Sequence, residues 1–274
     1  MPIADLGAIE LEYATQGDPH DPPIVMIRGL GTQMTEWPDV LLDGLEAADL
    51  FVVTFDNRDA GLSSGGPDGY RLEDMAADVV GLLDVLRIPR AHVFGISLGG
   101  MIAQHVAIAF PERVSSLISV MSSTGNPALP QAAPEVREWL TRAGTTRAEV
   151  IELSTQSRVV FGSPGYPESE AERRRAATLA YDRAYRPDGV ARQMRAAIAD
   201  GNRVERLAKL QRPALVIHGA DDALIPPEAG RDTARAIPGA ELVLVPGMGH
   251  NIPSPLAPEI VRIVVDFLGR QRLP

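Results

Sequence analysis

A serine stands between glycines in "GISLGG", residues 95–100, directly after an apolar run and directly before a stretch with helical periodicity. In this setting the G-x-S-x-G pattern is typical of a sharp strand-to-helix turn that projects the serine hydroxyl outward. Glycines relieve the crowding in such a turn because they lack a Cβ atom. The following helix directs N–H groups and a partial positive charge toward the serine. We therefore predict that Ser97 is a nucleophile; the plainer alternative is a helix N-cap.

A serine hydroxyl needs a base to act as a nucleophile at neutral pH, and histidine is the usual one. His250 lies in "VPGMGHNIP", a loop rich in glycine and proline just past the last predicted strand. A loop at the carboxyl edge of a parallel sheet can reach the crevice where such sheets bind ligands. We expect His250 to be the base. The other histidines fit this role less well: His20 in a polar loop, His92 at a strand start, His105 within a helix and His218 at the end of an apolar strand.

The imidazole of a histidine base must be oriented by a carboxylate, which also stabilises its cation. "HGADDALIP", residues 218–226, follows the preceding predicted strand and offers Asp221 and Asp222. One of the two is expected to cap a turn or a helix start. The residue types alone leave the choice between these neighbours open.

Apolar runs alternate with helix-period stretches along the chain, which predicts an α/β fold with a doubly wound, mostly parallel sheet. Several runs are apolar throughout, as expected for strands covered by helices on both faces. The N-terminal "AIELEYATQG" alternates in polarity and is predicted to be an antiparallel edge strand. The other predicted strands are 23–29, 50–56, 90–97, 114–122, 213–219 and 240–247, and the predicted helices are 36–48, 72–87, 98–110, 229–237 and 255–269.

One interval breaks this alternation, because about ninety residues separate the predicted strands that end at 122 and begin at 213, far more than a crossover needs. "TGNPALPQAAP" opens the interval and "LQRP" closes it, and helical patterns lie between them. We predict that residues 126–210 form a helical cap, or lid, over a core made of 1–125 and 211–274. The cap segment carries 14 basic and 11 acidic side chains. This excess predicts a solvated helix face or, alternatively, steering of acidic substrates.

The composition excludes several classes of protein. There is no cysteine, which excludes disulfides, thiol catalysis and cysteine-ligated zinc, and the formal net charge of −10 argues against nucleic-acid binding. No apolar stretch approaches the length of a membrane span, and the N-terminus lacks the pattern of a secretory signal. We expect a cytoplasmic protein without membrane attachment, either a monomer or a homodimer.

Five motifs, "RGLGTQ", "FDNRDAGLSS", "GISLGG", "HGADDALIP" and "PGMGH", occur in an order that resembles the α/β-hydrolase fold superfamily along nearly the whole chain. Within it the chain is most similar to the aclacinomycin methylesterase-like group of carboxylic ester hydrolases. The resemblance implies that Asp222 is the acid. An oxyanion hole needs backbone donors. One should be the N–H of Leu98, directly after the nucleophile, and the resemblance implies Leu30 as the other.

Members of the family often carry histidine before the first glycine of the oxyanion loop, where this chain has Arg28. Two hypotheses follow: Arg28 is structural and paired with a carboxylate, or it recognises an anionic group of the substrate. Asp56 and Arg58 are expected to hold loops in place. The residues that could line a substrate pocket, or belong to the core, are Met34, Trp37, Met101 and Trp139.

Together these residues predict a serine hydrolase that cleaves carboxylic esters of small to medium, fairly apolar molecules through an acyl-enzyme, without metal or organic cofactor. The alternatives on the same triad are an enol-lactone hydrolase, a C–C bond hydrolase and a cofactor-free perhydrolase. A small-ligand receptor built on a hydrolase scaffold is the alternative that is not an enzyme. The expected partner is in each case a small molecule.

Overall fold

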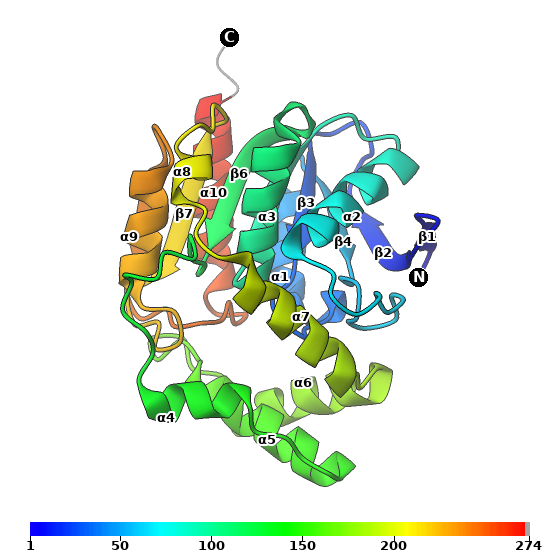
Figure 1. The fold of residues 1–274 in the computed structure, drawn as a ribbon, viewed down its shortest axis with the longest axis vertical. Helices are drawn as coiled ribbons and strands as arrows, with labels where there is room; N and C mark the ends of the chain where they lie inside the picture. The colour runs from blue at the N-terminus through cyan, green and yellow to red at the C-terminus, as the bar shows by residue number, and fades with distance from the viewer. Residues whose placement is uncertain (272–274) are drawn as a thin grey trace.

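The computed structural model describes residues 1–271 of the 274, and their centre is an eight-stranded sheet (Figure 1). The strand order is β1-β2-β4-β3-β5-β6-β7-β8. β1 and β2 are antiparallel to their neighbours, and all the later pairings are parallel. The strands are β1 (Ile3–Asp5), β2 (Glu10–Gln16), β3 (Pro23–Ile27), β4 (Phe51–Phe55), β5 (Ala91–Ile96), β6 (Val114–Val120), β7 (Ala214–Gly219) and β8 (Glu241–Val245).

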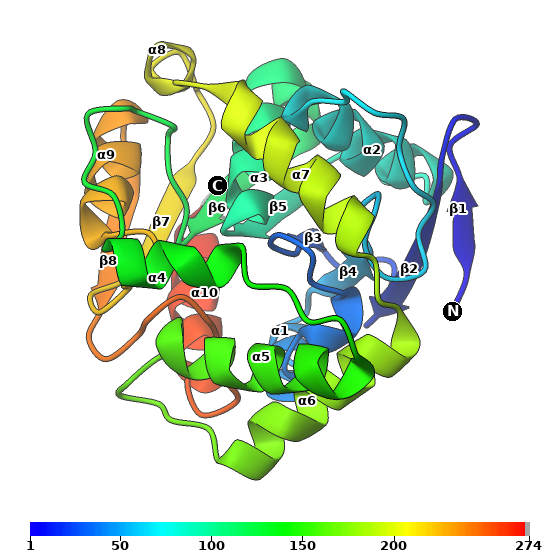
Figure 2. The ribbon, with the colours of Figure 1, turned by 60° about the horizontal axis from the view of Figure 1, so that its bottom comes forward.

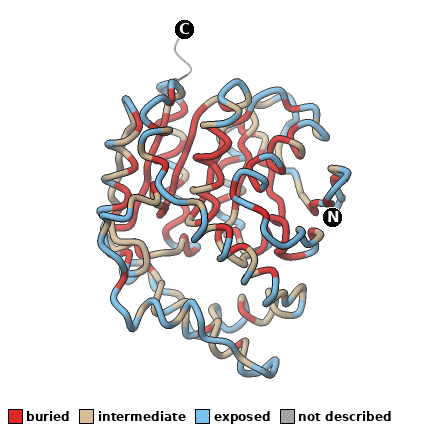
Figure 3. Tube along the Cα trace, viewed as in Figure 1, coloured by how far each residue is buried: buried red, intermediate tan, exposed pale blue. Residues whose placement is uncertain are grey.

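Helices cover both faces of the sheet, as its apolar strands require. Alternate residues of β3 point to opposite faces: Val25 and Ile27 pack in the core cluster with α2 and α3, while Ile24 and Met26 pack in the cluster with α1 and α10. Figure 3 shows the strands and the inner sides of these helices as the most deeply buried part of the chain. The helices of the core are α1 (Asp39–Glu46), α2 (Leu72–Val85), α3 (Leu98–Ala109), α9 (Pro227–Ala236) and α10 (Ala257–Gln271).

Between β6 and β7 the described chain forms helices and no strand. The helices α4, α5 and α6 lie beyond one end of the sheet, whereas α7 leads back along the core beside α2, and α8 packs against α3 and α9 (Figures 1 and 2). We call residues 126–210 the cap segment. Its outer surfaces are largely exposed (Figure 3). The helices of the cap segment are α4 (Pro134–Arg137), α5 (Arg147–Val160), α6 (Glu170–Arg183), α7 (Pro187–Asp200) and α8 (Val204–Leu207).

The predicted elements agree with the structure apart from one position in the sheet and the exact ends of several strands and helices. β2 is antiparallel as expected but is not the edge strand, because the three-residue β1 pairs with its outer side. α1 begins at Asp39 rather than 36, since Trp37 precedes Pro38 and is held in an extended conformation. None of the helices within residues 1–271 is long and apolar enough to cross a membrane.

Candidate active site

Ser97 occupies a strained turn between β5 and α3, as the glycine pattern predicted. Its backbone has φ 53° and ψ −120°, a conformation that non-glycine residues rarely adopt. The turn is tight: a Cβ atom on Gly99 would lie 2.2 Å from the carbonyl oxygen of Ile27, so only glycine fits there. The backbone of Ser97 is fixed from the neighbouring β6 side, where Val120 O accepts its N–H at 2.9 Å and the Ser122 hydroxyl donates to its carbonyl at 2.8 Å.

The structure brings Ser97, His250 and Asp222 into one chain of hydrogen bonds. His250 Nε2 lies 2.9 Å from Ser97 Oγ, and His250 Nδ1 lies 2.7 Å from Asp222 Oδ2. Because the carboxylate accepts the proton on Nδ1, Nε2 is left free to accept the serine proton. Asp222 is 4% exposed, so its charge acts on the imidazole with little screening by water.

The geometry also separates the two adjacent aspartates. Asp222 Oδ1 accepts the backbone N–H groups of Leu224 and Ile225, each at 2.9 Å, which leaves Oδ2 for the imidazole. Asp221 is exposed and accepts the N–H of Gly247 at 2.7 Å. Asp222 therefore faces the histidine, and its neighbour ties the loop that carries the histidine to the end of β7.

The loop of residues 28–32, after β3, lies directly against the serine. A Cβ atom on Gly29 would stand 3.3 Å from Ser97 Cβ and 3.8 Å from its Oγ. Leu30, the predicted oxyanion donor, is the next residue, and Leu98 opens α3 directly after the serine. Both predicted donors thus belong to backbone segments that adjoin Ser97.

Residues of the cap segment form hydrogen bonds with the loop that carries His250, a contact that nothing in the sequence indicated. Phe161 O accepts the N–H of His250 at 2.7 Å, and the Ser163 hydroxyl accepts the N–H of Gly249 at 3.0 Å while bonding to Asn251. The contact is so close that a Cβ atom on Gly249 would lie 2.0 Å from the carbonyl oxygen of Gly162. The position of the histidine therefore depends on the cap segment.

Arginines of the cap helices pair with carboxylates buried in the core. Arg183 of α6 contacts Glu12 and Asp56. Arg192 of α7 binds Asp59 with two hydrogen bonds of 2.9 and 2.5 Å. Asp56 and Asp59 are fully buried, so the basic excess of the cap segment is used in part to dock it on the core.

Arg58 and Asp56 hold loops as predicted. Arg58 forms a two-pronged ion pair with Asp78 of α2, at 2.6 Å for both hydrogen bonds. Asp56 accepts the N–H groups of Met34 and Leu62, at 2.7 and 2.9 Å. These bonds fix the segment after β4 beside the serine loop.

Arg28 does not form the ion pair with a carboxylate that one of the two hypotheses required. Its guanidinium lies 4.5 Å above the Trp37 ring and its Nε donates to Thr32 Oγ1 at 3.3 Å. Within residues 1–271 it forms no salt bridge, although the charges of Glu36 and Asp56 act on it from farther away. Burial lowers the pKa of Arg28 to about 10, which still leaves it cationic at neutral pH. A cation without a paired anion keeps the hypothesis of anion recognition open.

The predicted pocket residues divide by burial. Trp37 belongs to a core cluster, where its ring meets that of Phe94 edge to face at 5.8 Å, and Met34 is buried as well. Met101 is partly buried against the other core cluster. Trp139 is partly buried in the cap segment, where Arg142 stacks on its ring at 4.0 Å.

The histidines set aside in the sequence have other partners. His218 is fully buried, and its Nε2 donates to the carbonyl of Ile225 at 2.8 Å; burial lowers its pKa. His218 thus helps to hold the loop of Asp222. His92 Nδ1 lies 2.8 Å from Ser116 Oγ on the neighbouring strand. Neither belongs to the hydrogen-bond chain of the serine.

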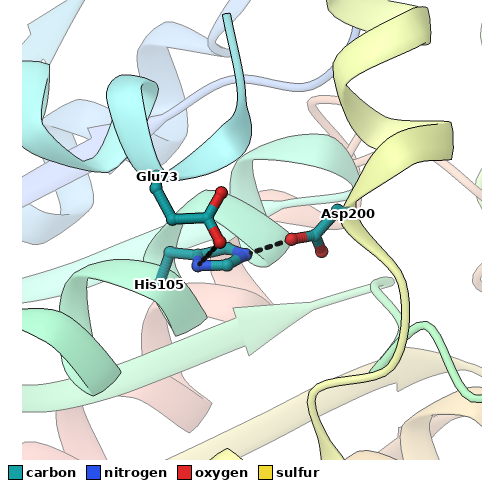
Figure 4. Close-up of side chains that lie close together, drawn as sticks. All are labelled: Glu73, His105 and Asp200. Carbon is teal, nitrogen blue, oxygen red and sulfur yellow. Dashed lines mark hydrogen bonds and ion pairs between the residues drawn. The ribbon is translucent and has the colours of Figure 1, made fainter.

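A second polar cluster, which shares no residue with the hydrogen-bond chain of the serine, places His105 between Glu73 and Asp200 (Figure 4). His105 Nε2 is 2.6 Å from Asp200 Oδ1, and Nδ1 is 3.7 Å from Glu73 Oε1. Three such side chains could in principle hold a metal ion, but each carboxylate already has a guanidinium partner, Arg203 for Asp200 and Arg206 for Glu73. The cluster is therefore an ion-pair network that ties the end of α7 to α2 and α3.

The sheet order, the serine turn and the histidine loop together define a fold, and comparison with known proteins identifies it. Residues 22–254 match the family model described as alpha/beta hydrolase fold, so the chain belongs to that family. The resemblance expected from the five motifs is thereby confirmed.

The chain is 30% identical over 260 residues to a rhodomycin D methylesterase of Streptomyces peucetius, covering 86% of this chain and 87% of that protein. It is also 30% identical over 215 residues to 3-oxoadipate enol-lactonase 2 of Acinetobacter baylyi, covering 78% and 76%. Among solved structures, the enol-lactonase from Burkholderia xenovorans has a TM-score of 0.77 and 26% identity, with 98% of this chain and 100% of that chain covered. The expected similarity to the methylesterase group is confirmed as well.

Proposed function

We propose that the protein is a serine hydrolase that cleaves carboxylic esters of small to medium, fairly apolar molecules, with Ser97, His250 and Asp222 as its catalytic triad. The observation that carries the proposal is the continuous hydrogen-bond chain from Ser97 Oγ through the imidazole to Asp222. The relatedness to methylesterases supports the ester as substrate class.

In the first half of the reaction, Ser97 Oγ attacks the ester carbonyl while His250 Nε2 takes the hydroxyl proton. The N–H groups of Leu30 and Leu98 stabilise the negative charge on the carbonyl oxygen of the tetrahedral intermediate. Asp222 holds the imidazolium that forms. When the C–O bond of the ester breaks, His250 returns the proton to the departing alcohol and leaves an acyl-serine.

In the second half, a water molecule attacks the acyl-serine and His250 takes one of its protons. The acid is released and the proton returns to Ser97 Oγ, which restores the enzyme. This sequence uses only groups of the chain and one water molecule.

The test is hydrolysis of p-nitrophenyl esters by Ser97→Ala. The variant should lose at least about a thousandfold in kcat, because the acyl-serine cannot form. Ser116→Ala removes a more deeply buried hydroxyl, on β6 near His92, and should keep wild-type turnover, with folding of both variants checked by circular dichroism. Near-wild-type turnover by folded Ser97→Ala would overturn the proposal.

A second candidate is enol-lactone hydrolysis, which the similarity to enol-lactonases favours. The same serine would attack a lactone carbonyl, and the enol would leave while still bound to the acyl group. A panel of methyl esters, enol-lactones and β-diketones separates the candidates. A higher kcat/KM for lactones than for any ester would replace the ester assignment, and preference for β-diketones would indicate C–C cleavage.

A further inference from the structure

Gln193 of α7 joins the cap segment to the loop that carries the predicted oxyanion donor. Its side chain is fully buried. Gln193 Oε1 accepts the backbone N–H of Gly31 at 2.8 Å, and Gln193 Nε2 donates to the carbonyl of Arg58 at 2.7 Å. Both ends of this amide are thus satisfied by backbone groups of two different core loops.

The orientation of the Gln193 amide is fixed by these partners, because one is a donor and the other an acceptor. The Arg58 end is itself anchored, since the guanidinium of Arg58 is paired with Asp78. The amide therefore holds the Gly31 peptide in a fixed position relative to the anchored Arg58 loop of the core. Loss of the bond to Gln193 would leave the Gly31 N–H buried without an acceptor, which is energetically unfavourable. The loop is therefore expected to keep this hydrogen bond.

Gly31 follows Leu30 directly, and its own conformation ties it to α7. It has φ +65°, and a Cβ atom in its place would lie 2.7 Å from Val190 Cγ2 on the same face of α7. On the other side of Leu30, Gly29 abuts Ser97. Leu30 is thus held between the nucleophile and the helix of the cap segment, so a shift of the Gly31 peptide changes the direction of the Leu30 N–H.

We propose that Gln193 is a positioning residue for the oxyanion hole: its amide holds the Gly31 peptide so that the Leu30 N–H points at the carbonyl oxygen of the substrate. The inference rests on the proposed function, since it concerns the tetrahedral intermediate of that reaction. It makes the cap segment part of the catalytic geometry, in addition to covering the site.

The test compares Gln193→Leu with Arg192→Leu, its neighbour on α7. Gln193→Leu keeps the size of the side chain and removes both hydrogen bonds. Misplacing a group by about 1 Å costs about a hundredfold in rate. We therefore expect kcat to fall about 10- to 100-fold with KM changed less than about threefold. Arg192→Leu loosens the same helix by removing the pair with Asp59 but leaves the Gly31 peptide bonded, so its kcat should stay within about threefold of wild type.

The affinity for a trifluoromethyl ketone is a second readout, which a general loosening of α7 would not change. It adds to the serine and places an oxyanion in the hole, so its affinity should weaken by the same factor as kcat/KM. Gln193→Glu keeps an acceptor for the Gly31 N–H and should retain more activity than Gln193→Leu. Normalising kcat to the concentration of phosphonate-titratable serine removes unfolded molecules from the comparison.

Equal losses in Gln193→Leu and Arg192→Leu, or a loss in KM alone, would overturn the proposal. So would unchanged affinity for the trifluoromethyl ketone. These results differ from failure of the proposed function, which would show as a wild-type protein that hydrolyses no ester and takes no phosphonate on Ser97.

Discussion

Replacing Asp222 with asparagine should lower kcat for ester hydrolysis by about four orders of magnitude while leaving the fold intact. The size follows from the amide orientation that the structure imposes. The N–H groups of Leu224 and Ile225 both point at Oδ1, at 2.9 Å, so the carbonyl oxygen of the new asparagine must take that place. Its NH2 group then faces His250 Nδ1, which lies 2.7 Å from Oδ2 in the native protein.

An NH2 group facing Nδ1 forces that nitrogen to accept a hydrogen bond, and the imidazole proton moves to Nε2. In this tautomer Nε2 cannot take the proton of Ser97. The wrong tautomer in a serine–histidine–aspartate triad costs about 10⁴-fold in kcat, equivalent to about 5 kcal/mol of transition-state stabilisation.

The assay is p-nitrophenyl ester hydrolysis under saturating substrate, with thermal unfolding as the check on the fold. Asp221→Asn is the matched control, because Asp221 is exposed and an amide oxygen can still accept the Gly247 N–H. It should stay within about threefold of wild type. An Asp222→Asn enzyme within tenfold of wild type, or a larger loss in Asp221→Asn, would refute the assignment of the acid.

Three further outcomes are expected. Arg183→Leu should lower the free energy of unfolding by about 3–5 kcal/mol, because it leaves the buried Asp56 without an ion-pair partner and the buried Glu12 with only the N-terminal ammonium, 3.9 Å away. Arg147→Leu, whose pair with Asp182 is half-exposed, should lower it far less, and equal urea midpoints for the two variants would contradict this. Burial lowers the pKa of His105 from 6.5 to about 4, so the unfolded chain binds the extra proton first. The contribution of His105 to the free energy of unfolding should be complete above about pH 6.5 and should be lost as the pH falls toward 4. Urea titrations across this range test it, and an equally steep decline in the His105→Gln variant would argue against this contribution. Arg28→Gln should raise KM about tenfold or more for esters that carry a carboxylate and little for neutral esters; an equal rise for both would dismiss anion recognition.

The sequence predicts those features that local patterns determine. The strands are recognisable because both faces of the sheet are buried, so runs such as "PALVIHG" are apolar throughout. The serine turn is recognisable because its glycines are required by backbone contacts, as Gly99 shows. The edge of the sheet was predicted wrongly, since the three residues of β1 carry no periodicity that a pattern could detect.

The contacts of the cap segment are beyond such patterns. Gln193 and Ser163 are ordinary polar residues in the sequence, and their roles arise from partners about 160 and 90 residues away in the chain. His105 likewise has the sequence context of any helix residue, and only the fold brings Asp200 to it. Asp221 and Asp222 differ in their contacts because the loop around them places them differently, and their identical residue type gives no indication of this.

Labelling with a fluorophosphonate, followed by mass spectrometry of the digested protein, tests the central claim most directly. If Ser97 is activated by His250 and Asp222, a single adduct should form on the peptide that contains Ser97, with loss of esterase activity in step with labelling. Labelling should also slow markedly in the His250→Ala variant. Loss of activity with the adduct on a different residue, or labelling of Ser97→Ala at the wild-type rate, would contradict the account.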